Sequence, residues 1–268
     1  MITFDLTSVS PMGAAYVQVL DRARAEIGEH LDDPGFGAPT AVRKAATPWR
    51  QATVALDEIH SALTSLAQRA WDIATDRDLT TQATAARITA AAAEARSQVD
   101  RLAADVRAKL TQMTDILARA AVPPRPGDTA TDEARIQGVK TDLRMVLDAV
   151  PAEPAALAER IAALLERAQR DGDQHTVYVL AATRWPADYV AARYPAAVEY
   201  AERLITAHID QVLDRTSGDE LAEVRRVYRA VTGANGVNAI TTVLAQLPSL
   251  IGAVSDWARS RAGAAVRW

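Results

Sequence analysis

The chain has 268 residues, a formal net charge of -4 and no cysteine. The length suits one large domain or two small ones, and the missing cysteine excludes disulfides and thiolate metal sites. Acidic and basic residues are interspersed, so the Lys/Arg-rich face that neutralises nucleic-acid phosphates is not expected. No apolar run approaches the roughly 20 residues of a membrane span. We therefore expect neither a nucleic acid nor a membrane as a partner.

Alanine dominates the apolar residues, and aromatic residues make up only 5% of the chain. Alanine has the highest helix propensity and buries little area, so it favours long, closely packed helices. Beyond the N-terminus almost nothing alternates with the period of two that half-buried strands show. The composition and the periodicity together predict an all-α fold.

The first ten residues form the exception. Ile2, Phe4 and Leu6 alternate with polar residues, which predicts an extended arm over residues 1–10 with one apolar face. Such an arm can add a strand to the sheet of another protein, so these three residues are our candidate partner-binding site. The alternative is that they fold back onto the helices of their own chain.

A first helix is expected to begin after Ser10 and to end near Leu31. Ser10 has the side chain of an N-cap, and Pro11 suits the first helical position. Residues 32–39 contain Pro and Gly in numbers that end a helix.

Two long helices should follow, separated by residues 75–81. We place the start of the first at Thr47-Pro48, a cap followed by proline, and the end of the second near Ala121. Asp76 or Asp78 can cap the second helix. Each carries an apolar stripe with steps of three and four residues, which marks one helix face. The stripes are Ala52, Leu56, Ile59, Leu63, Leu66, Ala70 and Ile73, then Ile88, Ala92, Ala95, Val99, Leu102, Val106, Leu110, Met113 and Leu117.

These stripes favour an antiparallel hairpin over residues 11–121, although a nearly straight rod with a kink at the joint stays open. Residues 122–128 hold three prolines and a glycine and predict a semi-rigid linker between domains. Residues 129–268 are then expected to form a smaller multi-helix bundle. Its helices are expected at about 131–150, 154–170, 174–185, 195–215, 219–231 and 237–262, with a kink at Pro248.

No residue pattern in the chain indicates a named chemistry. The four histidines, His30, His60, His175 and His208, form no metal-binding pair at helical spacing. The loop Asp171–His175 could supply oxygen ligands, but the calcium-loop pattern is not completed, so Gly172 is expected to end one helix and Asp173 to cap the next.

The glycine-rich stretch 232–238 precedes a predicted helix, and the free N–H groups of a helix N-terminus can bind an anion. It lacks, however, the preceding strand and the Gly-Lys-Ser/Thr sequence of a nucleotide-binding loop. We interpret it as a helix connector in which Gly and Asn adopt left-handed conformations. There is also no Gly-x-Ser-x-Gly elbow. We expect no enzyme activity, no cofactor and no metal. An unrecognised enzyme site would need a polar pocket among Tyr178, Trp185, Tyr200 and His208.

The joint between the two long helices also carries a family resemblance. The relevant stretches are 70–73 (Ala-Trp-Asp-Ile), 76–80 (Asp-Arg-Asp-Leu-Thr), 85–88 (Ala-Ala-Arg-Ile) and 99–102 (Val-Asp-Arg-Leu), with a later break at 170–173. This pattern resembles long-helix proteins of unassigned role from actinobacterial tailed phages and prophages, which are encoded among head and structural genes. The resemblance implies a role in the virion or its assembly and assigns no active residue.

The expected function is therefore that of a non-enzymatic helical structural protein of a phage virion or its assembly, in a minor capsid, scaffold-like or connector role. Its partners would be other virion proteins or further copies of itself, and its location the virion or the host cytoplasm. The alternative is a cellular helical adaptor or regulatory module.

Overall fold

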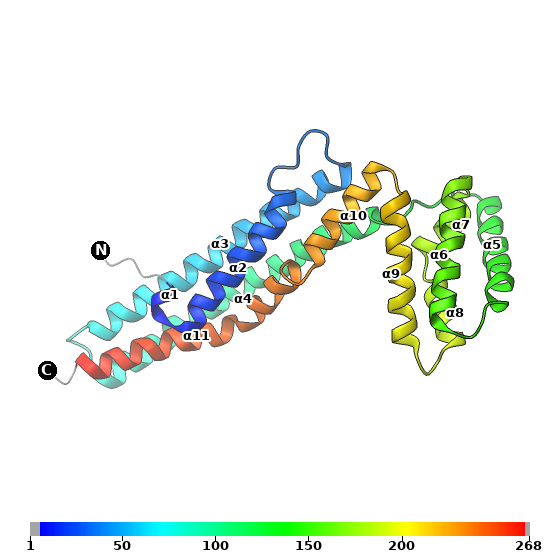
Figure 1. Cartoon of the computed structure of the whole chain (residues 1–268). Coiled ribbons are helices and arrows are strands. Elements are labelled where there is room, and N and C mark those ends of the chain that lie inside the picture. Colours follow the sequence, from blue (N-terminus) through cyan, green and yellow to red (C-terminus); the bar gives the residue numbers. More distant parts are fainter. Residues whose placement is uncertain (1–5, 266–268) are drawn as a thin grey trace. The chain divides into compact units, whose positions relative to one another are not determined.

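The computed structural model describes residues 6–265, and every regular element in this range is an α-helix (Figure 1). The all-α prediction is confirmed. Two residues of the predicted arm, Ile2 and Phe4, lie outside the described residues. The helices are α1 (Leu6–Val9), α2 (Pro11–Leu31), α3 (Thr40–Thr75), α4 (Thr81–Ala120), α5 (Ala130–Asp148), α6 (Pro154–Asp171), α7 (Gln174–Ala182), α8 (Trp185–Arg193), α9 (Val198–Thr216), α10 (Asp219–Thr232) and α11 (Val237–Ala265).

The chain divides into two compact units that do not follow its order. Unit 1 combines Met1–Leu117 with Val227–Trp268, and unit 2 is Ala118–Arg226. The predicted division into 11–121 and 129–268 was therefore wrong at the C-terminal end. Residues 122–128 do form a loop, but this loop belongs to unit 2 and separates no domains.

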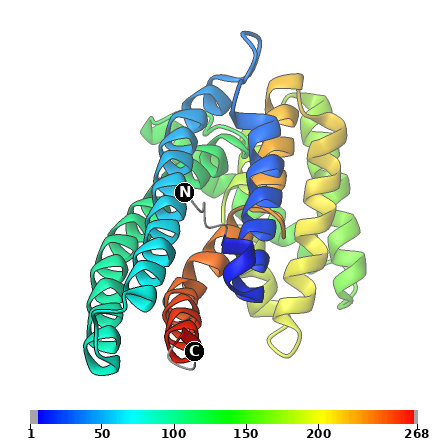
Figure 2. The same cartoon turned by 90° about the vertical axis from the view of Figure 1, so that its left-hand side faces the viewer.

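Unit 1 is built on an antiparallel hairpin of α3 and α4 (Figures 1 and 2). Arg69 on α3 and Glu94 on α4 form an ion pair at 2.8 Å. In a continuous straight helix two residues 25 positions apart would lie about 37 Å from each other. The ion pair therefore excludes the rod and establishes the hairpin.

The turn of the hairpin is held by a different cap from the expected one. Thr80 accepts a hydrogen bond from the backbone N–H of Ala83 at 3.2 Å and thereby caps α4. Asp76 instead accepts from the N–H of Asp78 at 3.0 Å inside the turn. The prediction of Asp76 or Asp78 as the cap was wrong, because Asp76 closes the turn that places Thr80 at the helix start.

The predicted stripe is buried along most of its length. Ile73, Ala92 and Leu102 are only half-buried, whereas Ala91 and Ala103 are buried in addition. The reason is that α4 contacts α11 as well as α3, and a helix with two neighbours buries a wider face than a coiled-coil seam. Arg107 on α4 donates to the carbonyl of Leu244 on α11 at 3.5 Å.

Helix α11 completes the core of unit 1. It packs against α2 and α3, and Trp257 stacks on Trp71 of α3 with ring centroids 5.6 Å apart. Near the hairpin turn, Arg259 donates to the hydroxyl of Thr89 on α4 at 3.1 Å. The predicted C-terminal bundle therefore loses its last helix to the long-helix unit.

By length and composition alone, the stretch Asp219–Ala262 is apolar enough to cross a membrane. It is interrupted between α10 and α11. The side chains that make α11 apolar lie in the core of unit 1, which explains its composition as that of a buried core helix. They are Ile240, Val243, Leu244, Leu247, Leu250, Ile251, Val254 and Ala258.

Helix α3 begins seven residues before the predicted start. Pro48 lies inside it, although proline cannot donate to the carbonyl four residues earlier. Val42, Ala45 and Ala46 are nonetheless buried. Their tertiary packing stabilises the helical turns between Thr40 and Pro48 and offsets the hydrogen bond that proline cannot make.

The predicted extended arm is not found at Leu6. This residue lies in the short helix α1, its side chain is 1% exposed, and α1 packs against α2 and α3. Of the two alternatives for the arm, Leu6 follows the fold-back onto its own chain. Burial of the leucine side chain where α1 packs against α2 and α3 is the physical reason.

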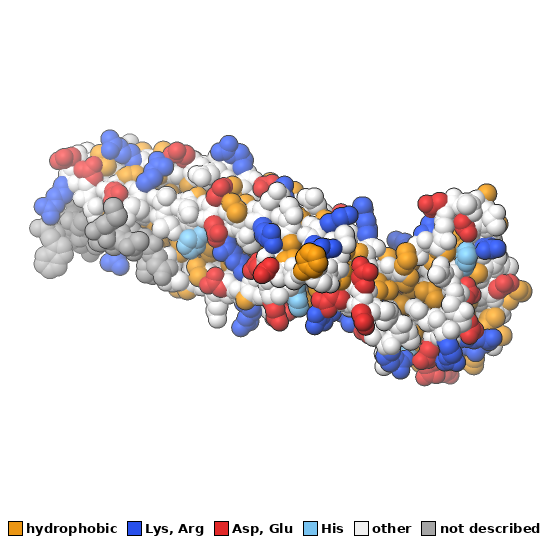
Figure 3. Space-filling view, turned by 90° about the horizontal axis from the view of Figure 1, so that it is seen from above, with side chains coloured by type: hydrophobic (Ala, Val, Ile, Leu, Met, Phe, Trp, Pro, Cys, Tyr) orange, Lys and Arg blue, Asp and Glu red, His pale blue; other side chains and the backbone are white. Residues whose placement is uncertain are grey.

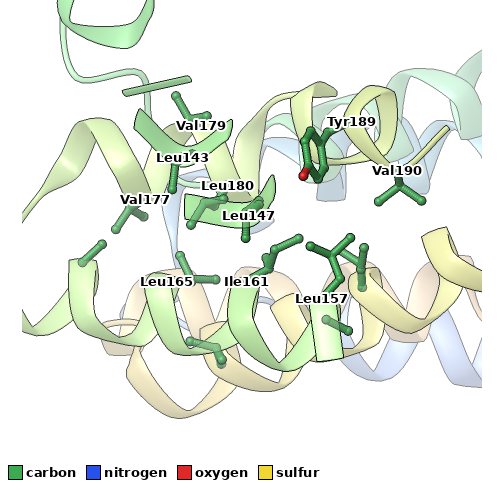
Figure 4. Close-up of a cluster of buried hydrophobic side chains, with 14 of the residues drawn as sticks. Leu143, Leu147, Leu157, Ile161, Leu165, Val177, Val179, Leu180, Tyr189 and Val190 are labelled. Carbon is green, nitrogen blue, oxygen red and sulfur yellow. The ribbon is translucent and has the colours of Figure 1, made fainter. Parts of the chain in front are cut away.

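Unit 2 has its own core, which α5 to α9 share (Figure 4). Leu147 of α5, Ile161 of α6 and Leu180 of α7 are at most 1% exposed and point toward one another. Between α6 and α7, Gly172 adopts a left-handed conformation with φ 69° and Asp173 caps α7 through the N–H of Thr176, as expected.

The connector between α10 and α11 depends on a close backbone approach. A Cβ at Gly236 would lie 2.0 Å from the carbonyl oxygen of Val231, so only glycine fits. The expectation of left-handed glycine and asparagine here was wrong, because none of residues 233–236 has a positive φ. Glycine is required for space and not for its dihedral range.

We predict that Gly236→Ala lowers the free energy of unfolding by about 1–3 kcal/mol, because the backbone must shift to admit the methyl group. The matched control is Gly252→Ala on α11, where nothing lies within 4 Å of the added Cβ. That change should raise stability by about 0.5–1 kcal/mol through helix propensity. Urea unfolding measures both, and equal effects at the two sites would contradict the account.

A buried tyrosine provides a second test. The hydroxyl of Tyr16 on α2 is buried and has no hydrogen-bond partner among the described residues. Burial raises its pKa to about 12, and the opposing charges of Arg24 and Asp57 act more weakly. In the unfolded chain the Tyr16 phenol loses its proton near pH 10, whereas in the folded chain it stays protonated up to about pH 12. The contribution of Tyr16 to the free energy of unfolding is therefore complete below pH 10 and is lost as the pH rises toward about 12.

Tyr16→Phe is expected to keep or raise the free energy of unfolding at neutral pH, by up to about 1 kcal/mol, because it removes an unsatisfied polar group. It should also remove part of the alkaline loss of stability. Denaturant midpoints from pH 8 to pH 12 test this. Tyr200→Phe, at a side chain that is 56% exposed, is the control. An unchanged alkaline profile in the Tyr16 variant would refute the assignment.

Candidate functional site

The most exposed large apolar side chain that the structure describes is Phe36, which is 99% exposed. It lies in the loop of residues 32–39, which projects beyond the adjoining ends of α2 and α3 (Figures 1 and 2). Gly35 and Gly37 flank it, and each has open space around its Cα. We call residues 33–38 the Phe36 loop.

The base of the Phe36 loop is fixed although its tip is free. The indole of the buried Trp49 donates to the Asp32 carboxylate at 2.7 Å, and Arg50 donates to the Asp32 carbonyl at 2.9 Å. Within the loop, the N–H of Ala38 donates to the carbonyl of Gly35 at 2.9 Å. The aromatic ring is therefore held out from an anchored turn.

Isolated exposed apolar residues are common on protein surfaces, so exposure alone does not define an interface. Phe36 differs in degree, because the next most exposed large apolar side chain, Met145, reaches 64%. It is also one of only two phenylalanines in a chain that uses few aromatics. An aromatic side chain offers a large apolar contact area at low entropic cost, which makes it a common anchor at interfaces.

Unit 2 carries a groove of about 310 Å³. The proline-rich loop, the end of α6, the start of α7 and the connection from α9 to α10 surround it. Its apolar walls include Pro123, Pro124, Val177 and Leu221. Arg125 is the single charged lining residue, and the buried hydroxyl oxygen of Ser217 has no partner among the described residues. The groove is at the small end of the range for ligand sites and suits one ring-sized group.

A buried arginine ties the first and last parts of unit 2 together. Arg225 on α10 is 7% exposed and contacts Asp210 at 2.5 Å and Asp214 at 3.3 Å, both on α9. It also donates to the carbonyl of Ala121, just after α4, at 3.1 Å. Each of these contacts either pairs the Arg225 charge with a carboxylate or supplies a donor to a backbone carbonyl at the end of α4. We therefore assign the Arg225 cluster a structural role.

A second arginine closes the end of α5. Arg193 donates to the carbonyls of Leu147 and Val150 at 2.5 Å and to the hydroxyl of Tyr189 at 2.6 Å. Tyr189 in turn donates to Asp148 at 2.7 Å. Burial, followed by the bond to Asp148, raises the pKa of Tyr189. This network satisfies the last carbonyls of a helix, which is again a structural task.

The four histidines lie on four different helices, α2, α3, α7 and α9. His30 sits in the last turn of α2, where a positive charge would favour the helix dipole. His208 contacts the carbonyl of Leu204 at 2.8 Å, one turn earlier. His175 Nε2 lies 3.6 Å from Asp132, whose pKa is lowered mainly by hydrogen bonds from Thr129. Among the described residues, no group of three or more His, Asp or Glu could hold a metal ion.

The four residues named for an enzyme pocket do not line the groove of unit 2. Tyr178 and Trp185 pack against the core of that unit, and Trp185 stacks on Tyr189 with centroids 5.5 Å apart. Tyr200 is 56% exposed on α9. The space-filling view shows acidic and basic side chains mixed over the visible face, without a basic stripe there (Figure 3).

Sequence reasoning missed both surface features. Residues 32–39 were interpreted only as a helix break, although a lone phenylalanine between two glycines was a usable signal. The groove had no such signal, because segments from 123 to 221 in the sequence come together only in the folded unit. The predicted site of Ile2, Phe4 and Leu6 contributes one described residue, and that residue is buried.

No family model matches the chain, and neither the curated proteins nor the solved structures contain a significant match.

The Arg225 cluster gives a direct test of its structural role. Arg225→Met should destabilise the protein by about 1–3 kcal/mol, because it removes the donor to the carbonyl of Ala121 and the positive charge beside Asp210 and Asp214. The effect stays below that of a fully buried pair because both aspartates keep partial solvent contact.

Arg167→Met, which removes an exposed pair with Asp171 on α6, is the control and should change stability by less than about 0.5 kcal/mol. Thermal or urea unfolding measures both variants. A neutral Arg225 variant would show that the buried cluster does not stabilise unit 2.

Proposed function

We propose that this protein is a non-enzymatic helical assembly protein of a phage particle. In this role it would act as a minor capsid, scaffold-like or connector component, in the virion or in host cytoplasm during assembly. Its partners would be other virion proteins and further copies of itself. The fully exposed Phe36 on an anchored loop is the observation that carries the proposal, because an aromatic anchor of this kind is suited to protein contacts.

The polar clusters support a role without catalysis. Arg225 and Arg193 each use their hydrogen bonds on helix ends and nearby carboxylates, so neither leaves a reactive group in a cavity. The virion assignment depends on the resemblance of residues 70–102. In the fold these residues form the end of α3, the hairpin turn and the first part of α4. They lie in the long-helix unit, which also carries the Phe36 loop.

The test is the location of the protein during a phage infection or prophage induction of the host that carries its gene. We expect it in purified virions or in assembly intermediates separated by density and detected by mass spectrometry. Recovery with a host complex in the absence of particles would favour the cellular adaptor. Absence from both fractions, with a stable monomer in light scattering, would overturn the proposal.

A further inference from the structure

The Phe36 loop is the place where the described part of the chain exposes an aromatic residue outside a helix. Phe36 is 99% exposed, and its loop projects beyond the adjoining ends of α2 and α3 (Figures 1 and 2). Among residues 6–265, every other aromatic residue lies in a helix except Tyr194, which is 9% exposed. Exposed loop tips are preferred sites of proteolytic cleavage, whereas a helix has to unwind first. Phe36 is therefore the aromatic residue that a protease reaches most readily in the folded protein.

The backbone around Phe36 can also open into the extended form in which proteases bind a substrate. Gly35 and Gly37 flank the residue, and nothing lies within 4 Å of a Cβ built on either glycine. Within residues 33–38, which the structure describes in full, the backbone makes one hydrogen bond, from the N–H of Ala38 to the carbonyl of Gly35 at 2.9 Å. Opening the loop breaks this one bond, whereas opening a helix breaks several in succession.

The side chain at position 36 determines which class of protease fits the loop. An apolar specificity slot, such as that of chymotrypsin, accepts an aromatic ring on the residue before the cleaved bond. Residues 33–38 contain neither lysine nor arginine, so a protease that selects basic residues finds no site there.

We propose that the peptide bond between Phe36 and Gly37 is a processing site for an endopeptidase whose specificity pocket accepts an aromatic side chain. Water adds across this bond, so that Phe36 gains a carboxylate and Gly37 gains an ammonium group, and no further reactant takes part. This modification site goes beyond the proposed function and is independent of it, because it requires only the folded chain and the protease.

The segment before the cut stays bound to the rest of unit 1. Helix α2 packs against α3 and α11, and its side chains Leu20, Ile27 and Leu31 are at most 3% exposed. This apolar packing does not depend on the bond between Phe36 and Gly37. Releasing the segment would expose all three side chains to water, which is unfavourable.

Polar contacts join the same two parts of the chain. Arg24 on α2 pairs with Asp57 on α3 at 2.7 Å. The carboxylate of Asp32 accepts from the Trp49 indole at 2.7 Å, and its carbonyl accepts from Arg50 at 2.9 Å. In each pair one residue precedes the cut and the other follows it. Cleavage consequently yields a two-chain form, in which residues 1–36 remain bound without a covalent link to residues 37–268.

The first experiment is limited proteolysis of the folded protein with chymotrypsin, read by mass spectrometry. Within residues 6–265, the first cut should follow Phe36. Phe36→Ala should slow cleavage in the loop by about 100-fold or more, because the slot loses its ring, whereas Phe36→Tyr should keep it. Tyr200→Ala on α9 removes another exposed aromatic side chain and should leave the pattern unchanged. An earlier cut elsewhere in this range, or equal loop cleavage in Phe36→Ala, would overturn the proposal.

The second experiment separates access to the backbone from the preference for a ring. Trypsin should leave residues 33–38 of the wild type intact and should cut Phe36→Arg after position 36. Circular dichroism and thermal unfolding establish that each variant is folded. A folded Phe36→Arg variant whose loop resists trypsin would show that the loop backbone is closed to proteases, and this result would overturn the proposal.

The third experiment tests the two-chain form. After cleavage, the two fragments should elute together in gel filtration without denaturant and should separate in denaturant. Their reassociation is bimolecular, so the unfolding midpoint of the cleaved protein should rise with protein concentration while that of the intact chain stays constant. Fragments that separate without denaturant, or a midpoint that is independent of concentration after cleavage, would contradict a bound two-chain form.

Discussion

The burial of α11 against α2 and the α3–α4 hairpin is the contact on which unit 1 depends. Two packed helices leave one side of their apolar stripes open, because each helix covers only the part of its partner that faces it, and this open side forms an apolar face of the hairpin. The α11 side chains from Ile240 to Ala258 cover that face, and hydrogen bonds from Arg107 and Arg259 link α11 to α4. Without α11, the apolar stripe of the hairpin would lie partly in water.

This contact also explains the order of the chain. The C-terminal segment has to return to the core that the N-terminal segment began, so residues 118–226 form an insertion with a core of its own. The insertion has a boundary inside α4 and another inside α10. In unit 2, the side chain of Arg225 links the first residues after α4 to α9 and α10. A single buried arginine thus joins the two ends of the inserted segment.

Local patterns in the sequence predicted most of the helices and their ends. Ser10 caps α2, Gly172 and Asp173 separate α6 from α7, and residues 32–39 and 122–128 break the helical pattern, because these features depend only on neighbouring residues. The predicted start of α3 at Thr47 was wrong, because the burial of Val42 and Ala46 arises only in the folded unit and local sequence signals do not report it. The predicted domain boundaries were wrong for the same reason. Apolar periodicity indicates which face of a helix is buried but not which other helix buries it.

The same distinction between local and long-range features applies to the candidate site. Phe36 could be found in the sequence as an aromatic residue in a glycine- and proline-rich break, but its full exposure is a property of the folded loop. The groove could not be found, because its walls come from three segments that lie far apart in the sequence, residues 123–125, 168–177 and 217–221. The local apolar alternation of Ile2, Phe4 and Leu6 did not predict the backbone at Leu6, which is helical and buried. A local sequence pattern can indicate a single exposed side chain, but it cannot indicate a surface whose residues come from separate segments.

Native-state hydrogen exchange in rising denaturant tests the central structural claim most directly, because it reports which segments open together. Amides of α2, α3, α11 and the part of α4 before Leu117 should open with one free energy and one denaturant dependence. Amides of α5 to α9 should form a second set with its own values. Opening of α11 together with α5 to α9, and apart from α3, would contradict the account.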